Sequence, residues 1–192
     1  MRRRIALQST SRTRGAGSAK FIRHVHLVLR NHHENYTRNY CAATDNAIHL
    51  PMPTYPRSPK ETVCGMMYFP RMLDKIRLHS RGELHEDYHK NLGARRAADG
   101  ACCNFLRVNY ADLRNRVLQG GTDEEILEWC FEKGRRLNEG DMLVWNSFAS
   151  KLGWCDFATP TLELAKSKAG ISDRDDIATI PDLIDFDEGR KS

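Results

Sequence analysis

The chain contains one string of residues that a metalloenzyme could use. Residues 85–89 read His-Glu-Asp-Tyr-His. In the HExxH motif two histidines one helical turn apart bind zinc and the glutamate polarises the attacking water. Such a helix is long and apolar, whereas Gly82 and Gly93 bracket too few residues, about ten, for a helix that is stable without packing support. We therefore interpret His85 and His89 as loop histidines and expect no metal centre and no cofactor.

Two adjacent cysteines offer a second candidate chemistry. Cys102 and Cys103 could supply a thiolate nucleophile, with His85 or His89 as the base. The alternative, which we favour, is that one cysteine packs inward and the other is incidental. None of the six cysteines forms a CxxC pair, so we predict the reduced thiols of a cytoplasmic protein. Two further cysteines lie in apolar patterns and are expected in the core: Cys130 and Cys155.

A dense group of charges follows the pattern of one helix. Between residues 69 and 76 the apolar side chains recur at i, i+3, i+4 and i+7, which predicts an amphipathic helix. Its other side carries Arg71, Asp74, Lys75 and Arg77. Carboxylates and cations three or four residues apart can pair along a helix, so the simplest interpretation is a solvated face. The same groups could also orient an anion or the carboxylate of a partner.

A polar stretch of about twenty residues, 81–101, follows this helix without a clear period. Loops of this length are uncommon in compact domains and are often functional. The three histidines that follow residue 52 lie in or beside it: His79, His85 and His89. We predict that any binding site lies where the 71–77 face meets this loop, and its candidate residues are Arg71, Asp74, Lys75, Arg77, His85 and His89. The alternative is that the stretch contains a short helix and is scaffold.

The other helix signals predict an all-α fold, a compact bundle of about five to six short helices. Ser58 is expected to cap a first short helix, and residues 102–106 a helical turn leading into a helix that ends at Gly120. A capping box at Thr122 opens the next helix, which stops at Gly134. Further helices are expected over 138–152 and 159–169, followed by a turn-rich tail from residue 172. The three tryptophans are expected in core or inter-helix contacts: Trp129, Trp145 and Trp154.

The charge of the chain is unevenly distributed. Residues 1–50 hold nine basic and two acidic side chains, a balance of +7, whereas the whole chain carries +5. The remainder is therefore weakly acidic, which argues against a nucleic-acid surface there. We interpret residues 1–51 as a disordered basic extension outside a folded domain of 52–192. The alternatives are an organelle transit peptide and a translation start at Met52. No apolar run approaches the ~20 residues of a membrane-spanning helix.

Several strings in the domain resemble the DUF5069 family, bacterial proteins of unknown function. They are Pro56-Arg57-Ser58-Pro59, Phe69-Pro70-Arg71-Met72-Leu73-Asp74-Lys75-Ile76-Arg77, Asp123-Glu124-Glu125-Ile126-Leu127-Glu128-Trp129, Val144-Trp145-Asn146 and Asp187-Glu188-Gly189-Arg190. The similarity covers about residues 52–190. It implies a small helical domain in a bacterium, which argues against a transit peptide, and it implies no reaction.

Two functions remain open on the sequence. The first, which we favour, is a non-enzymatic helical module that binds a small ligand or a protein partner through the 71–77 face and the 81–101 loop. The second is a small enzyme that uses residues 81–103, with His85, His89 and Cys102 or Cys103 as its candidate groups and possible dependence on a metal. No tight constellation of base, nucleophile and orienting group can be read from the sequence.

Overall fold

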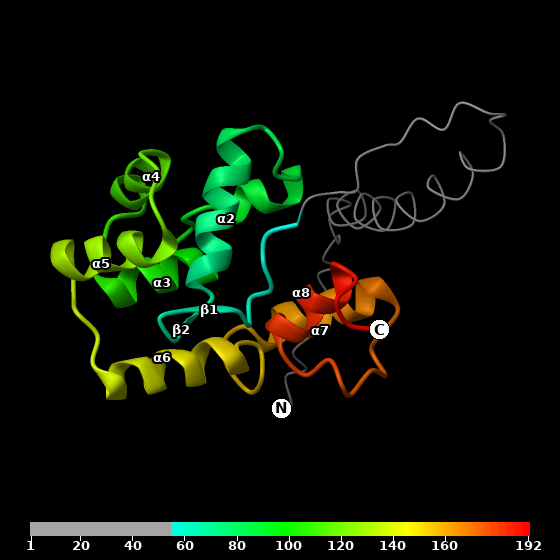
Figure 1. The fold of residues 1–192 in the computed structure, drawn as a ribbon. Coiled ribbons are helices and arrows are strands. Elements are labelled where there is room, and N and C mark those ends of the chain that lie inside the picture. The colour runs from blue at the N-terminus through cyan, green and yellow to red at the C-terminus, as the bar shows by residue number, and fades with distance from the viewer. Residues whose placement is uncertain (1–54) are drawn as a thin grey trace, which may run out of the picture. The chain divides into compact units, whose positions relative to one another are not determined.

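The computed structural model describes residues 55–192 (Figure 1). These residues form seven α-helices, one 3-10 helix and one short hairpin, so the predicted all-α fold is confirmed. The helices after the hairpin are α2 (Phe69–Ser80), α3 (Ala98–Leu106), α4 (Tyr110–Leu118), α5 (Asp123–Lys133), α6 (Glu139–Lys151), α7 (Thr159–Ala169) and α8 (Ile180–Asp187). The predicted extension 1–51 and the alternative start at Met52 lie outside the described residues. Within those described, no helix is long and apolar enough to cross a bilayer.

A hairpin stands where the sequence predicted the first helix. Strands β1 (Thr62–Val63) and β2 (Met66–Met67) pair antiparallel, so the helix expected after Ser58 is wrong. The two turn residues, Cys64 and Gly65, have φ of 46° and 79°. A two-residue hairpin turn with both φ values positive matches the twist of the strands that it joins, and glycine adopts it at no steric cost.

Helix α6 is fixed to this hairpin by side chains of two neighbouring residues. The indole Nε1 of Trp145 donates to the Met67 carbonyl at 2.8 Å. The Asn146 amide accepts from the Met67 N–H at 3.0 Å and donates to the Gly65 carbonyl at 2.7 Å. Trp145 is buried, as predicted, whereas Trp154 is 56% exposed, so its expected place in the core is wrong.

Helix α2 lies at the centre of the core, against α4 and β1. The predicted apolar stripe is confirmed, since all four of its side chains are buried: Phe69, Met72, Leu73 and Ile76. Cys130 is also buried, as predicted. Two cysteine predictions are wrong, because Cys102 and Cys103 are both buried and Cys155 is exposed.

The polar stretch 81–101 is not one loop. It contains a 3-10 helix, η1 (Glu86–Asn91), and the beginning of α3, so the alternative of a short helix is the correct one. Helix α3 is longer than the predicted turn at 102–106, and α4 is a separate helix from Tyr110.

In the second half of the chain, three helices begin or end at the capping residues that the sequence predicted. Thr122 and Asn138 form the capping boxes of α5 and α6, and Gly170 ends α7 in a left-handed conformation, so these three helices are confirmed. The tail contains a helix that the sequence analysis missed. Thr179 caps α8 by accepting from the Asp182 N–H, and this helix returns the C-terminal residues to α2.

Candidate functional site

The charged face predicted on α2 is not a solvated face. The side chains of Arg71 and Lys75 are 2% and 4% exposed, and each forms an ion pair with a residue far along the chain. The interpretation of a solvated face is therefore wrong for these two residues. Other segments cover this side of α2 with complementary carboxylates, and the helix is enclosed on both sides.

Arg71 is paired with the C-terminal residues. Its Nη1 donates to Glu188 Oε2 at 3.0 Å and to the Arg57 carbonyl at 2.7 Å, and its Nη2 donates to Glu188 Oε1. The Tyr88 hydroxyl donates to the same Glu188 Oε1 at 2.5 Å, and Arg190 pairs with Oε2. Burial raises the pKa of Glu188, but the hydrogen bond and charge of Arg71, together with the hydrogen bonds of Tyr88 and Arg190, outweigh burial, and the net pKa is lowered. We call these five residues the Glu188 cluster.

Lys75 belongs to a second enclosed group, the Lys75 triad, made of Lys75, Asp99 and Tyr68. The Lys75 ammonium lies 2.6 Å from Asp99 Oδ1 and 3.0 Å from the Tyr68 hydroxyl, which itself donates to Asp99 Oδ1 at 2.8 Å. The Gly93 N–H donates to the other carboxylate oxygen at 3.2 Å. Burial lowers the pKa of Lys75, and the charge of Asp99 offsets part of this effect. All three side chains are buried, so the triad is closed to ligands.

The two remaining charges of α2 are partly exposed and also paired. Arg57 binds Asp74 through two hydrogen bonds of 2.7 and 2.8 Å. Asp123, in the first turn of α5, accepts from Arg57 at 2.5 Å and pairs with Arg77 at 2.7 Å. Asp74 and Arg77 therefore tie α2 to the segment before the hairpin and to α5.

The HExxH string does not have zincin geometry. His85 is the N-cap of η1, with Nδ1 accepting from the Asp87 N–H at 3.3 Å, and His89 lies inside this 3-10 helix. With three residues per turn, positions four apart point about 120° away from each other. The His89 ring packs edge-on against His79 with centroids 4.9 Å apart. Within residues 55–192 no three His, Cys, Asp or Glu side chains are grouped to hold a metal ion.

The paired cysteines lack the environment of a nucleophile. Burial raises the pKa of Cys102 well above the ordinary thiol value, and it raises the pKa of Cys103 to about 12. A reactive cysteine needs a lowered pKa and access to solvent. Both thiols are therefore protonated core groups at neutral pH.

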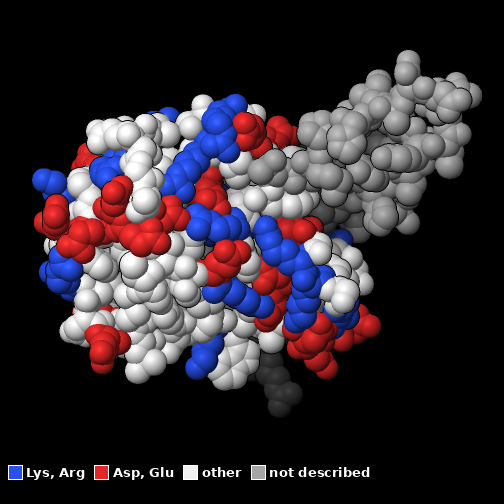
Figure 2. All heavy atoms as spheres, in the orientation of Figure 1, with Lys and Arg blue, Asp and Glu red and all other residues white. Residues whose placement is uncertain are grey.

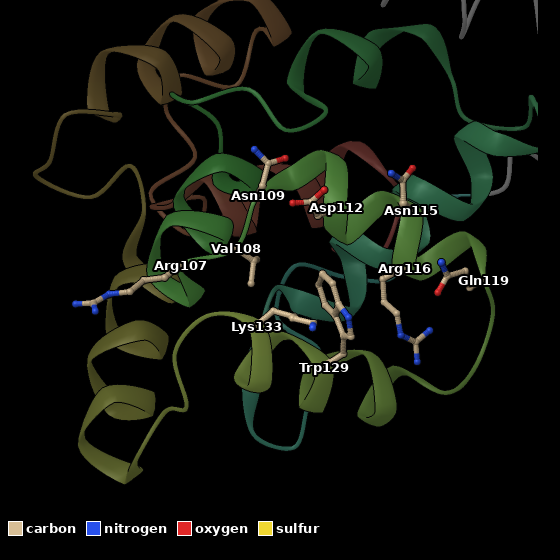
Figure 3. Close-up of a pocket in the computed structure, with 9 residues that line it drawn as sticks. All are labelled: Arg107, Val108, Asn109, Asp112, Asn115, Arg116, Gln119, Trp129 and Lys133. Atoms are coloured by element: carbon tan, nitrogen blue, oxygen red, sulfur yellow. The ribbon is translucent and has the colours of Figure 1, made fainter.

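An open cleft lies on another part of the domain, between α4 and α5 (Figure 3). Its volume is about 480 Å³, within the range of small-ligand sites. Three of its lining residues are basic, and the lining comprises Arg107, Val108, Asn109, Asp112, Asn115, Arg116, Gln119, Trp129 and Lys133. Figure 3 shows the Trp129 ring rising from α5 toward α4 with Lys133 beside it, while the Arg107 side chain extends away at one end and Arg116 and Gln119 lie toward the other.

A close backbone contact fixes the spacing of this cleft. Gly134 ends α5, and a Cβ at this position would lie 2.1 Å from the Leu106 carbonyl oxygen. The next residue, Arg135, donates its N–H to the same carbonyl at 2.9 Å. Arg107 then turns the chain into α4 with a left-handed φ of 58°. Only glycine permits this approach, so the C-terminal end of α5 is held against the connection between α3 and α4.

The charges of the cleft, unlike those of α2, are largely unpaired. Within the described part of the chain, the side chains of Arg107 and Lys133 form no hydrogen bond or ion pair, and Arg116 donates only to the Gly120 carbonyl, at 2.7 Å. Against these three cations the lining has one carboxylate, Asp112. The partly exposed ring of Trp129 lies among them, and its indole N–H has no hydrogen-bond partner within residues 55–192. Such a cleft can attract an anion and offer a planar group an aromatic face.

Sequence reasoning placed the candidate site on α2 and missed this cleft. Trp129 and Lys133, four residues apart on α5, were the available signal, because i, i+4 positions share one helix face. Their partners come from the α3–α4 connection and from α4, so the convergence is a property of the fold. The binding role of the six α2 and η1 candidates stays a prediction.

Comparisons with known proteins identify the domain. The family model of DUF5069, a domain of unknown function, matches residues 53–190. No curated protein and no solved structure matches the chain.

Proposed function

Since the chain belongs to the DUF5069 family, a domain of unknown function, we propose its role from the geometry of its side chains. We propose a non-enzymatic binding module that takes a small organic anion with a planar ring into the cleft between α4 and α5. The anionic group binds Lys133 and the neighbouring arginines, and the ring packs on Trp129.

One observation carries this proposal, namely the unpaired cations around a partly exposed indole. The two enclosed cations of α2 are closely paired, Arg71 with Glu188 and Lys75 with Asp99. Cations left without partners beside an aromatic ring have their hydrogen-bonding capacity available for a ligand. Asp112 and the amides of the wall can contribute orientation through donors on the ligand.

The enzyme alternative has less support. Its nucleophile would be Cys102 or Cys103, and burial raises the pKa of both thiols. His89 is engaged with His79 and the Leu84 carbonyl.

The α2 site remains a proposal of narrower scope. Arg71 and Lys75 are enclosed, which leaves Asp74, Arg77, His85 and His89 as its reachable members. The side chains of Asp74, Arg77 and His85 are 20%, 28% and 38% exposed, and His89 is exposed. A partner that bound there would have to compete with the ion pairs of Arg57 and Asp123.

The ligand class can be tested by calorimetry on the purified chain. Phenyl phosphate, benzoate and adenosine 5′-monophosphate supply the anion and the ring together, while inorganic phosphate and benzyl alcohol each supply one part. Because the cleft is open to solvent, we expect affinities no tighter than about micromolar for the combined probes and weaker binding of the single ones.

Matched variants locate the binding. Lys133→Ala should weaken the best probe about tenfold, as expected for loss of a charge-assisted hydrogen bond. Lys90→Ala is the control, since Lys90 is equally exposed and lies on η1 outside the cleft. Failure of every ring-bearing anion to bind, or binding that Lys133→Ala and Trp129→Phe both leave unchanged, would refute the proposal.

A further inference from the structure

Helix α6 is apolar on two opposite faces. Its inner face packs Trp145 and Ala149 into the core. On its outer face Leu143, Val144 and Phe148 are 70%, 63% and 36% exposed. A helix on the surface of a domain normally turns charged residues outward, yet residues 142–150 contain none.

This outer face is one continuous stripe. The exposed positions 140, 143, 144, 147, 148 and 151 follow the spacing of a single helix face. The surface in the α6 region of Figure 2 is largely uncharged. Exposed apolar stripes depleted of charge are typical of the central part of protein interfaces, so the stripe needs a partner.

We propose that the partner is a second copy of this chain, with the two α6 helices packed antiparallel about a two-fold axis. Such an axis at the middle of the stripe places Leu143 opposite Phe148 of the second copy. It places Val144 opposite Ser147, a small residue that allows the helices to approach closely. Both contacts occur twice in the dimer, because in a two-fold interface each contact between two residues is repeated by the symmetry.

The charges at the two ends of α6 favour this occupant and this orientation. Helix α6 begins at Glu139 and ends at Lys151, both exposed, and neither forms an ion pair among residues 55–192. In the antiparallel pair Glu139 of each copy meets Lys151 of the other, whereas a parallel pair would bring like charges together. Electrostatic complementarity of this kind sets orientation and specificity.

The interface is small. Thirteen residues of helix span about 20 Å, which covers less than the ~800 Å² per partner of a standard stable interface. We therefore expect a dimer that dissociates in about the micromolar range. It uses a different surface from the cleft, so the dimer does not depend on the proposed ligand.

Sedimentation equilibrium of the full chain tests the contact. The natural chain should show a reversible monomer–dimer equilibrium. Leu143→Glu should weaken it at least tenfold, whereas Leu118→Glu, at a 44% exposed leucine on α4, should leave it unchanged. Circular dichroism checks that each variant is folded, and Val144→Glu replaces Leu143→Glu if the latter is not.

Charge reversal tests the antiparallel arrangement. Glu139→Lys and Lys151→Glu should each weaken the dimer severalfold, and the double variant should restore it, because the opposite charges then meet again. A chain that is monomeric at every concentration overturns the proposal. A dimer that neither Leu143→Glu nor Val144→Glu weakens overturns it too. Reversals without restoration in the double variant overturn it too, since they indicate a different arrangement of the copies.

Discussion

Two groups of cations in this domain have opposite environments. Arg71 and Lys75 on α2 are enclosed and fully paired, with Glu188 and Asp99 as their partners. Lys133 and Arg107 at the α4–α5 cleft are exposed and unpaired within residues 55–192. The sequence suggested a site at the first group, and the geometry favours the second.

The difference shows what each kind of charge can do. Enclosing an ion costs several kcal/mol, which a well-placed counter-charge repays. A buried pair therefore fixes which segments meet, and exchanging its partner for a ligand would leave a carboxylate buried alone. An exposed cation keeps its hydration until a ligand arrives, so it can bind and release an anion with little cost to the fold. Predictions that separate stability from binding test this contrast directly.

The largest expected effect is on stability at the Lys75 triad. Lys75→Ala leaves the Asp99 carboxylate buried without its counter-charge, and the unfolding free energy should fall by about 3–5 kcal/mol. Arg107→Ala, a surface change, should alter it by less than about 0.5 kcal/mol. Urea unfolding followed by circular dichroism measures both.

A double substitution sharpens this result. Lys75→Met with Asp99→Asn removes both charges and should recover a large part of the loss, because no isolated ion remains. If Lys75→Ala alone were nearly neutral, the contrast between the two groups of cations would fail.

The second effect is an acid dependence of stability at the Glu188 cluster. The pKa of Glu188 is lowered in the folded state, so its stabilising contribution is complete above the unfolded value of 4.5 and is lost as the pH falls through the lower folded value. Glu188→Gln should cost about 1.5–3 kcal/mol at pH 7, the range for hydrogen bonds to charged groups. The variant should lose less stability on acidification than the natural chain does. If the unfolding free energies of the two proteins fell by the same amount on acidification, the assignment to Glu188 would be wrong.

The helices that could be predicted from the sequence are those whose ends are set by hydrogen bonds between residues close in the chain. Thr122 and Asn138 bond to N–H groups three residues ahead, so a short window of sequence contains the whole signal. Serine is also a favoured capping residue, but the Ser58 hydroxyl donates to Asp185, 127 residues away. Its capping pattern therefore misled, and the hairpin that follows depends on a turn, Cys64-Gly65, whose first residue is unusual for it.

The candidate sites depended on long-range contacts that no local pattern records. Arg71 meets Glu188 117 residues away, and Lys75 meets Asp99 24 residues away. The sequence of an amphipathic helix does not show whether carboxylates from distant segments will cover its charged side. The cleft likewise combines α4, α5 and the connection before α4. Sequence reasoning could name the charged residues of α2 but not decide which of them face solvent.

A smaller effect separates binding from folding at the cleft. Trp129→Phe keeps an aromatic ring but reduces its size and removes the indole N–H, so binding of phenyl phosphate should weaken by about 0.5–1 kcal/mol, the scale of a single aromatic contact. The variant should stay folded, because Trp129 is only partly buried. Calorimetry and thermal unfolding of one preparation measure both quantities, and a large loss of thermal stability without a loss of binding would place Trp129 in the core and outside the site.

The smallest expected effect is the response to salt, and it probes the two groups of cations in one experiment. Mobile ions screen exposed charges over about 8 Å at physiological ionic strength and over about 3 Å at 1 M. Buried pairs exclude those ions, so the stability loss caused by Lys75→Ala should be nearly the same at low and high sodium chloride. Binding of phenyl phosphate at Lys133 should instead weaken severalfold over that range, and Lys133→Ala should remove most of this dependence, while Lys90→Ala should not. If salt left binding unchanged, the phosphate would be held by neutral donors, and the unpaired cations of the cleft would have no part in recognising it.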